Sequence, residues 1–458
     1  MLEPADANAL DARVWPGSAV RDDTGRVTIG GVAATALAER FGTPLYVLDE
    51  ADARSRAAAV RAAFDGELAR VGSSATVYYA GKAFLSTQAV RWMLEAGLSV
   101  DVCSGGELAV ALAAGAEPAR LGLHGNNKSL AEIDRAVGIG VGAIVIDSVV
   151  EIGRVAEAAA RHGRVQPVRL RINSGVHAHT HEYLATARED QKFGIPLADA
   201  EDAVALIRAQ AGLRFIGLHS HIGSQIFEPE GFEEAARRLM AVHARLLVAG
   251  PVPELNLGGG FGIAYTSADR PLAIGVAARR IAEVVAAAAR EHGVPVPAVA
   301  VEPGRAVIGP AGVTLYEVGT IKDVLVRGDD GGEHVRKYVS VDGGMSDNAR
   351  PALYGADYSV RIASRVSDAA PALVRLAGKH CESGDVLVHA DYLPGDVRPG
   401  DLVAVPATGA YCWSLASNYN HLGRPPVVAV RDGEARLIVR GETEEDILAR
   451  DVILEGDA

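Results

Sequence analysis

The sequence contains little cysteine and no long hydrophobic run. Only 3 of its 458 residues are cysteine, too few for a disulfide framework, so we expect a reducing compartment, the cytoplasm. The longest apolar runs, such as 281–289, fall short of the roughly 18 residues that a membrane-spanning helix needs. The first residues, MLEPADANALDARVWPG, carry acidic groups where a signal peptide needs a basic and then an apolar region. We therefore expect no membrane segment and no secretory leader.

Basic charge is also in short supply. The chain has 45 Lys and Arg against 58 Asp and Glu, a formal net charge of −13. A surface that repels phosphate gains nothing from counterion release, so the balance disfavours nucleic-acid binding. Hydrophobic residues, at 49%, are as frequent as in ordinary globular proteins. The length allows a large core and suggests two or three domains.

Between about residues 76 and 303, short β-branched runs alternate with Ala-rich stretches of helical period. The eight expected strands are 76–83, 98–104, 120–126, 142–148, 167–173, 215–222, 254–260 and 298–304. Near-continuous apolar strands separated by helices indicate a parallel sheet buried on both faces, and eight is the number that closes a (β/α)8 barrel. An open doubly wound sheet ranks second, since no early Gly-x-Gly-x-x-Gly turn follows a first strand.

The pattern changes after about residue 311, where short strands are separated by Gly, Asp and Pro turns. We expect an antiparallel β domain formed by the C-terminal part together with the N-terminal stretch. The predicted organisation is therefore an α/β chain with an N-terminal segment of the β domain (1–50), a TIM barrel (51–310) and a C-terminal β domain (311–458).

Chemistry in barrel enzymes sits at the C-terminal ends of the strands. Seven of the eight expected strand ends carry polar residues, and the eighth carries three glycines. These strand ends carry Lys82, Asp101, His124, Asp147, Arg171 with Asn173, His219 with His221, the glycines 258–260, and Glu302. Any one of them is explained as a solvated loop residue, but the set together indicates a site.

Three of these positions match the needs of pyridoxal 5'-phosphate (PLP). Lys82, a lysine expected to be poorly hydrated, offers an amine for imine formation. The glycines 258–260 let backbone amides approach a phosphate in the place where this fold binds one. Glu302 is suited to keep a pyridine nitrogen protonated, which makes the ring a strong electron sink.

Neighbouring residues extend this interpretation. Arg305 and Ser224 offer further phosphate donors, and His221 is suited to lie over the face of the ring. The tract His177–His181 offers three imidazoles that could converge on a metal, but it lies in a long loop after the fifth expected strand, so we expect a substrate-side loop and no metal. Cys103 and Cys412 are expected to be structural.

Nine motifs, in order along the chain, carry a family resemblance: YAGKAF, DVCSGGEL, HGNNKS, GLHSHIGSQI, LNLGGGFGI, EPGR, RPALYGA, CESGD and GAY. With these motifs the sequence resembles the diaminopimelate decarboxylases, PLP enzymes that pair an alanine-racemase-like barrel (fold type III) with a β domain. The resemblance covers about residues 45–425. The sequence departs from the family pattern in two places: Gly81 stands where Val or Met is frequent, and Lys379-His380 precede Cys381 where Pro-Ile or Pro-Thr is common.

The resemblance implies roles for individual residues. The implied catalytic residues are Lys82, which forms the imine, His221, which stacks on the ring, and Cys381, the proton donor supplied by the second subunit of a homodimer. The implied cofactor-binding residues are Lys82, Asp101, His221, Ser224, Gly258, Gly259, Gly260, Glu302, Gly304, Arg305 and Tyr411. The implied substrate-binding residues are Arg305, Arg350, Tyr354, Glu382, Ser383 and Tyr411.

The implied reaction is the decarboxylation of meso-2,6-diaminopimelate to L-lysine and CO2, the last step of lysine biosynthesis. An arginine suits the distal carboxylate of that substrate and Glu382 its ammonium group. The alternatives are a decarboxylase of the ornithine or arginine type, whose substrates lack the distal carboxylate, a racemase, which Glu302 disfavours, and a non-catalytic regulator on the same fold.

Overall fold

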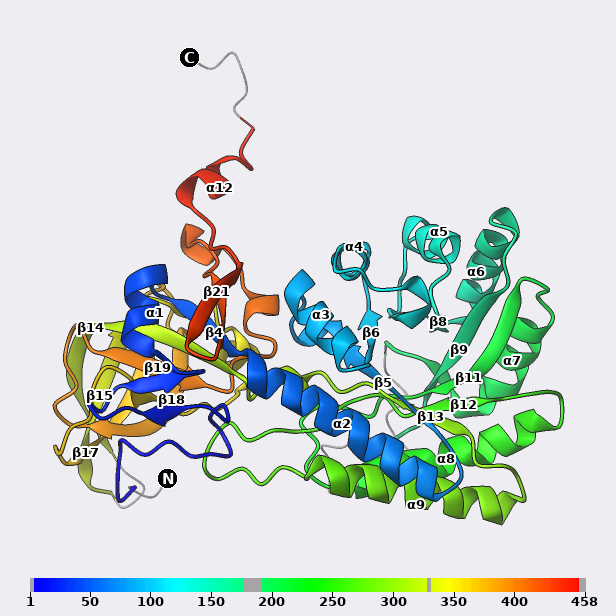
Figure 1. The fold of residues 1–458 in the computed structure, drawn as a ribbon, viewed down its shortest axis with the longest axis horizontal. Coiled ribbons are helices and arrows are strands. Elements are labelled where there is room, and N and C mark those ends of the chain that lie inside the picture. Colours follow the sequence, from blue (N-terminus) through cyan, green and yellow to red (C-terminus); the bar gives the residue numbers. More distant parts are fainter. Residues whose placement is uncertain (1–3, 177–191, 328–330, 453–458) are drawn as a thin grey trace. The chain divides into compact units, whose positions relative to one another are not determined.

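The chain folds into two compact units in the computed structural model, which describes residues 4–176, 192–327 and 331–452 (Figure 1). One unit, the barrel unit, comprises residues 54–263 and 270–307. The other, the sheet unit, comprises residues 1–53, 264–269 and 308–458. Residues 264–269 lie between the two sequence stretches of the barrel unit but belong to the sheet unit.

Eight parallel strands close a ring in the barrel unit. Each strand pairs in parallel with the next, and the last pairs with the first. The strands are β5 (Ala75–Ala80), β6 (Ser99–Val102), β7 (Leu121–Leu123), β8 (Ala143–Ile146), β9 (Gln166–Asn173), β11 (Leu213–His219), β12 (Glu254–Asn256) and β13 (Ala298–Val301). A short strand, β10 (Ile195–Pro196), adds to β9. The expected (β/α)8 barrel is confirmed.

Helices lie around this ring (Figure 1). They are α2 (Glu50–Arg70), which begins in the sheet unit, and α3 (Thr87–Glu95), α4 (Gly105–Ala113), α5 (Leu130–Ile139), α6 (Val149–Arg161), α7 (Ala200–Arg208), α8 (Glu230–Leu247), α9 (Ile274–His292) and α10 (Arg305–Ile308). Because the helices cover the outer face and side chains fill the interior, β7 and β8 are buried along their whole length. This explains why the barrel strands have apolar runs rather than alternating patterns.

Serine side chains start three of the helices just after the strands. Ser86 accepts a hydrogen bond from the Ala89 amide at the start of α3, and Ser104 does the same at α4. Ser129 forms a full capping box with Glu132 at α5. These caps satisfy amides that would otherwise be unpaired, so the loops between strand and helix are short and hold the residues at the strand ends in place.

The sheet unit has a mixed sheet of nine strands with a smaller three-stranded sheet, β1 (Val20–Arg21), β2 (Val27–Ile29) and β3 (Val32–Ala33), beside α1 (Ala34–Phe41). The large sheet contains β4 (Leu45–Asp49), β14 (Gly312–Arg327), β15 (Glu333–Val341), β16 (Arg361–Ile362), β17 (Pro371–Ala377), β18 (Val386–Pro394), β19 (Leu402–Pro406), β20 (Val427–Arg431) and β21 (Glu434–Val439). Two short helices are α11 (Arg350–Tyr354) and α12 (Glu444–Leu448).

The N-terminal stretch contributes a central strand to that sheet, since β4 pairs with both β14 and β20. The separate β domain, built from both ends of the chain, is confirmed. Its pairing is more mixed than expected, because β4 runs parallel to β20 and β15 parallel to β17. In the second case the long connection that carries α11 and β16 leads the chain back to start β17 in the same direction as β15.

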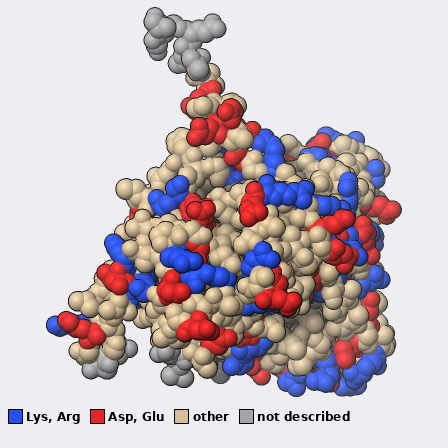
Figure 2. Space-filling model, turned by 60° about the vertical axis from the view of Figure 1, so that its left-hand side comes forward, with Lys and Arg blue, Asp and Glu red and all other residues tan. Residues whose placement is uncertain are grey.

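No described helix is both long and apolar enough to cross a bilayer. On the face that Figure 2 shows, Lys and Arg side chains lie among Asp and Glu side chains. On this face the positive side chains do not form one continuous basic patch. This agrees with a sequence in which Asp and Glu outnumber Lys and Arg.

Candidate active site

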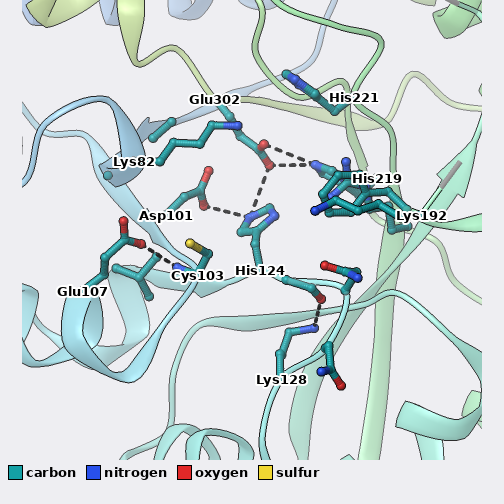
Figure 3. Close-up of a pocket in the computed structure, with 18 of the residues that line it drawn as sticks. Lys82, Asp101, Cys103, Glu107, His124, Lys128, Lys192, His219, His221 and Glu302 are labelled. Carbon is teal, nitrogen blue, oxygen red and sulfur yellow. Dashed lines mark hydrogen bonds and ion pairs between the residues drawn. The ribbon is translucent and has the colours of Figure 1, made fainter. Parts of the chain in front are cut away.

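A cavity of about 550 Å³ opens at the C-terminal ends of the barrel strands. Its wall contains residues from every expected strand end except those of β8 and β12, among them Lys82, Asp101, His124, Arg171, His219, His221 and Glu302. Figure 3 shows Lys82 and Asp101 on one side of Glu302 and His219 and His221 on the other. His124 lies below Glu302 in this view. The barrel therefore brings residues more than 200 positions apart in sequence into one site.

Lys82 stands in a 3-10 turn (Gly81–Ala83) directly after β5. Its side chain is exposed to the cavity, so the expectation of a poorly hydrated lysine is wrong for the protein alone. The reason is that Lys82 stands in the turn after β5, where its side chain borders the cavity instead of packing in the core. Gly304 supports this turn: a Cβ there would lie 3.0 Å from both the Ala80 carbonyl oxygen and the Ala83 Cβ.

Glu302 is buried at the end of β13 and is surrounded by hydrogen-bond donors. Asn256 Nδ2 donates to its Oε1 at 2.8 Å, and His219 Nε2 lies 3.0 Å from the same oxygen. His124 Nε2 lies 3.5 Å away. Carboxylate and imidazole atoms of this kind also suit a metal ion, and the ligand atoms of Glu302, His124 and His219 lie within 4.8 Å of one another. The exposed amine of Lys82 in the same cavity favours an organic carbonyl cofactor instead.

The protonation states at this cluster follow from burial. Burial lowers the pKa of His124 and of His219 to about 4 and that of His221 to about 3, so all three rings are neutral near pH 7. Burial alone would raise the pKa of Glu302, but the imidazoles and the hydrogen bond from His219 outweigh it and hold that pKa well below its usual range. Glu302 is therefore a buried carboxylate kept ionised by its neighbours.

Asp101 shows the opposite behaviour. Burial, and then the charge of Glu302, raise the pKa of Asp101 well above its usual range. Its Oδ1 lies 3.1 Å from His124 Nε2, but the contact lacks hydrogen-bond geometry, and both carboxylate oxygens are buried without a hydrogen-bond partner. Buried polar atoms without partners are rare. Together with the nearby carboxylate and amine, they fit a site made for a polar group that the chain itself does not supply.

The glycines 258–260 follow β12 beside the cavity and are not among the residues of its wall. A Cβ on Gly259 would lie 2.2 Å from the Glu302 carbonyl oxygen, so only glycine allows the loop to pack against β13. Two of the three amides are already hydrogen-bonded, Gly258 N to Asn256 Oδ1 at 2.9 Å and Gly259 N to His221 Nδ1 at 3.3 Å. The expected anion cradle is thus tied directly to the residues around Glu302.

Arg305 and Ser224 lie together, as expected for two donors to one phosphate. Arg305 donates to Ser224 Oγ at 2.7 Å, which connects α10 with the loop after β11. Ser224 directly follows Gly223, which lines the cavity. His221 lines the cavity too, and its hydrogen bond with Gly259 fixes one edge of the ring.

Sequence reasoning missed several residues that hold this site. Asn256, wholly buried, bridges Glu302 and Gly258; the signal was a polar residue inside the apolar run LNLGGG. Lys128, also buried, donates to Glu151 at 2.9 Å and to two backbone carbonyl oxygens, and so fixes the loop after β7 that carries His124. Its position in the HGNNKS motif gave no sign of a buried ion pair.

Cys103 corrects another expectation. The residue as a whole is exposed and lines the cavity, so it is not a buried structural residue. Partial burial of the thiol and the neighbouring Glu107 raise its pKa to about 12, so it stays protonated at neutral pH. Cys412, in contrast, is buried as expected.

The remaining predicted residues belong to the sheet unit. Cys381, Glu382 and Ser383 form an exposed turn between β17 and β18. In α11, Tyr354 is 69% exposed, whereas the Arg350 guanidinium is buried against the rings of Tyr265 and Tyr358. Tyr411 has a left-handed backbone, with φ of 67°. The tract His177–His181 lies outside the described residues.

Comparison with known proteins gives the class first. The model of the family "Pyridoxal-dependent decarboxylase, pyridoxal binding domain" matches residues 52–309. The barrel and its cavity are thus those of a PLP-dependent decarboxylase.

The particular family follows from full-length relatives. The chain is 52% identical to the diaminopimelate decarboxylase of Mycobacterium tuberculosis, over 97% of this chain and 98% of that protein. A crystal structure of diaminopimelate decarboxylase from M. jannaschii has a TM-score of 0.88 at 31% identity and covers 96% of this chain and 99% of its own. A second structure of that protein, in complex with L-lysine, gives the same score. The chain belongs to the diaminopimelate decarboxylases.

Proposed function

We infer that the protein decarboxylates meso-2,6-diaminopimelate to L-lysine and CO2 with PLP as cofactor. The observation that carries this is the ionised carboxylate of Glu302, held by His219 and Asn256 in the cavity that Lys82 enters. PLP, when bound, supplies an electron sink that accepts the pair left behind when the substrate carboxylate departs as CO2.

The residues of the barrel fit that cofactor at four points. Lys82 offers the amine that holds its aldehyde and gives way to the substrate amine. Glu302 offers a negative charge that stabilises a protonated ring nitrogen. Ser224 and Arg305, beside the glycine loop, offer donors for its phosphate. His221, neutral and fixed by Gly259, offers a flat apolar face for the ring.

The sheet unit supplies the remaining groups in this proposal. Loss of CO2 leaves a carbanion at Cα, and we assign the proton that restores the C–H bond to the thiol of Cys381. Glu382 would bind the distal ammonium group, and Arg350, or Arg305 of the barrel unit, would bind the distal carboxylate, as charge-assisted pairs. Tyr354, Ser383 and Tyr411 complete the proposed substrate and cofactor contacts.

A panel of substrates tests the reaction. Release of CO2 is measured with the stereoisomers of diaminopimelate and with lysine, ornithine and arginine; we expect turnover of the meso isomer, with L-lysine as product. Preferred turnover of ornithine or arginine would refute the assignment.

Glu382→Ala should weaken the preference for diaminopimelate far more than it weakens retention of the cofactor.

A pair of lysine variants tests the cofactor site. Lys82→Ala should abolish the visible imine absorbance of the purified protein. The matched control is Lys192→Ala, which removes another lysine from the wall of the same cavity and should leave the absorbance in place. Loss of absorbance in both variants, or in neither, would contradict the role of Lys82.

We further propose a cytoplasmic homodimer in which each active site takes Cys381 from the partner subunit. The free, exposed cysteines Cys103 and Cys381 suit a reducing compartment, and the exposed turn that carries Cys381 suits a contact with a partner subunit. It is tested by mixing Lys82→Ala with Cys381→Ser subunits, each inactive alone. In a two-fold symmetric dimer with shared sites, an equal mixture regains about a quarter of the wild-type activity. No recovery on mixing would argue against shared sites.

A further inference from the structure

Asp385 holds the turn that carries Cys381 through hydrogen bonds to backbone amides. This buried carboxylate accepts the His380 amide at 2.8 Å and the Met345 amide at 2.6 Å. Beyond these bonds the four residues 381–384 are exposed. The position of Cys381 therefore depends on what holds the start of the turn.

His380 occupies that place, and both of its ring nitrogens have partners. The side chain is buried, with Nδ1 3.0 Å from Asn420 Oδ1 and Nε2 2.8 Å from Ser346 Oγ. Room for the ring depends on Gly344, where a Cβ would lie 2.6 Å from His380 Cδ2. The Ile or Thr that is common before the cysteine in the family has no side-chain nitrogen, so it could not replace the two contacts that the imidazole makes with Asn420 and Ser346.

The same asparagine oxygen reaches Cys381. The Cys381 amide, which acts only as a donor, donates to Asn420 Oδ1 at 3.3 Å. The atom facing it must therefore be the amide oxygen, and His380 must carry its proton on Nδ1 to donate to that oxygen. His380 Nε2 is then the acceptor for the Ser346 hydroxyl. One arrangement of protons satisfies all three contacts.

Asn420 adopts an unusual conformation to offer this oxygen. Its φ is 50°, and the following His421 has φ of 57°. Left-handed residues other than glycine are uncommon, and asparagine is among those that tolerate the conformation best. Such backbone conformations persist where the surrounding structure enforces them, often next to functional groups.

We propose that His380 is a positioning residue for the proton donor: its imidazole fixes Asn420, and Asn420 fixes the amide of Cys381. The inference rests on the proposed role of Cys381 in the reaction. It concerns a residue outside the barrel cavity, and it predicts an effect on the proton-transfer step rather than on the binding of cofactor or substrate.

Three His380 variants of the full-length holoenzyme test this. The side-chain amide of Asn lies near the position of His380 Nδ1, so His380→Asn keeps a donor toward Asn420. The longer side chain of Gln reaches the position of His380 Nε2, so His380→Gln keeps only the contact with Ser346. His380→Ala keeps neither. We expect kcat to fall roughly fivefold in the Ala and Gln variants, the factor that one lost hydrogen bond corresponds to, and to stay near wild type in the Asn variant. KM and the visible absorbance of the cofactor should not change.

Amide hydrogen exchange in the peptide that contains Cys381 provides a readout independent of activity. Exchange should be faster in His380→Ala and His380→Gln and unchanged in His380→Asn. Asn420→Gly, which suits the left-handed backbone and leaves the buried imidazole in place, should also speed it, even if His380→Ala fails to fold. Equal exchange in all variants, or faster exchange with unchanged kcat, would overturn the inference. Full activity of Cys381→Ser would instead refute the donor role, while the exchange data still decide whether His380 holds the turn.

Discussion

Replacing Glu302 by Gln is the sharpest test of the cavity, because the amide keeps the size of the side chain and removes only its charge. The pKa of Glu302 lies well below its usual range, so wild type carries a full negative charge there at neutral pH. A neutral amide no longer stabilises a protonated ring nitrogen. The electron sink weakens, and kcat should fall while the other contacts of the cofactor remain.

The magnitude follows from what a buried charge contributes. Removing one partner of a buried ion pair costs about 3–5 kcal/mol. Since each 1.36 kcal/mol is a factor of ten in rate, this cost corresponds to a fall in kcat of about 10²- to 10⁴-fold. We expect the lower half of that range, about 10²- to 10³-fold, because Gln can still accept the hydrogen bond from Asn256. A second cost arises at His219, whose Nδ1 has no partner. If Gln donates to Nε2, the ring proton must move to that unpaired atom, which costs about 1–3 kcal/mol of stability.

The assay separates these effects. CO2 release from meso-diaminopimelate gives kcat, titration of the visible absorbance gives cofactor affinity, and thermal unfolding gives stability. Glu302→Asp is the matched control, since it keeps the charge and shortens the side chain; it should lose less activity than Glu302→Gln. If Glu302→Gln retains cofactor and loses less than about threefold in kcat, the assignment of Glu302 to the ring nitrogen is refuted.

Further predictions concern the support of the site and the stability of the barrel. Lys128→Ala should lower the free energy of unfolding by about 3–5 kcal/mol, because it leaves Glu151 as an unpaired buried charge; thermal unfolding should show that Lys128→Met with Glu151→Leu recovers part of the loss. Gly259→Ala should cost cofactor binding, measured by absorbance, because its Cβ would overlap the Glu302 carbonyl oxygen; normal affinity would contradict the packing described. The pKa of buried His243 is lowered from 6.5 to about 4 by burial. The unfolded state therefore binds more protons between these values, and stability should fall as the pH drops from about 6.5 to about 4; His243→Leu should flatten that decline in denaturant titrations.

The sequence predicted the barrel well because its signals are local and repeated. Most of the strands are short, mainly apolar runs, and seven of the eight expected strand ends carry a polar residue, so the residues at the C-terminal ends of the strands could be named without coordinates. Lys82 and Glu302 illustrate this, since both positions follow from counting strands. The family resemblance then supplied the residues of the sheet unit.

What the sequence could not predict depends on contacts between distant segments. The hydration of Lys82 depends on the direction of the turn after β5, and the burial of Lys128 depends on Glu151, 23 positions further on. Asn256 reads as one polar residue in a strand until Glu302 is placed beside it, 46 positions later. The parallel pairing of β4 with β20 joins the two ends of the chain and has no local signal.

Asn256 also limits how this site can change over time. Because one side chain connects the loop after β12 with the carboxylate on β13, neither element can be redesigned or drift alone. If the glycine loop were grafted into another barrel without Asn256, the loop would lose the side chain that fixes its conformation. Surveys of natural variants should accordingly find these positions exchanged together or not at all.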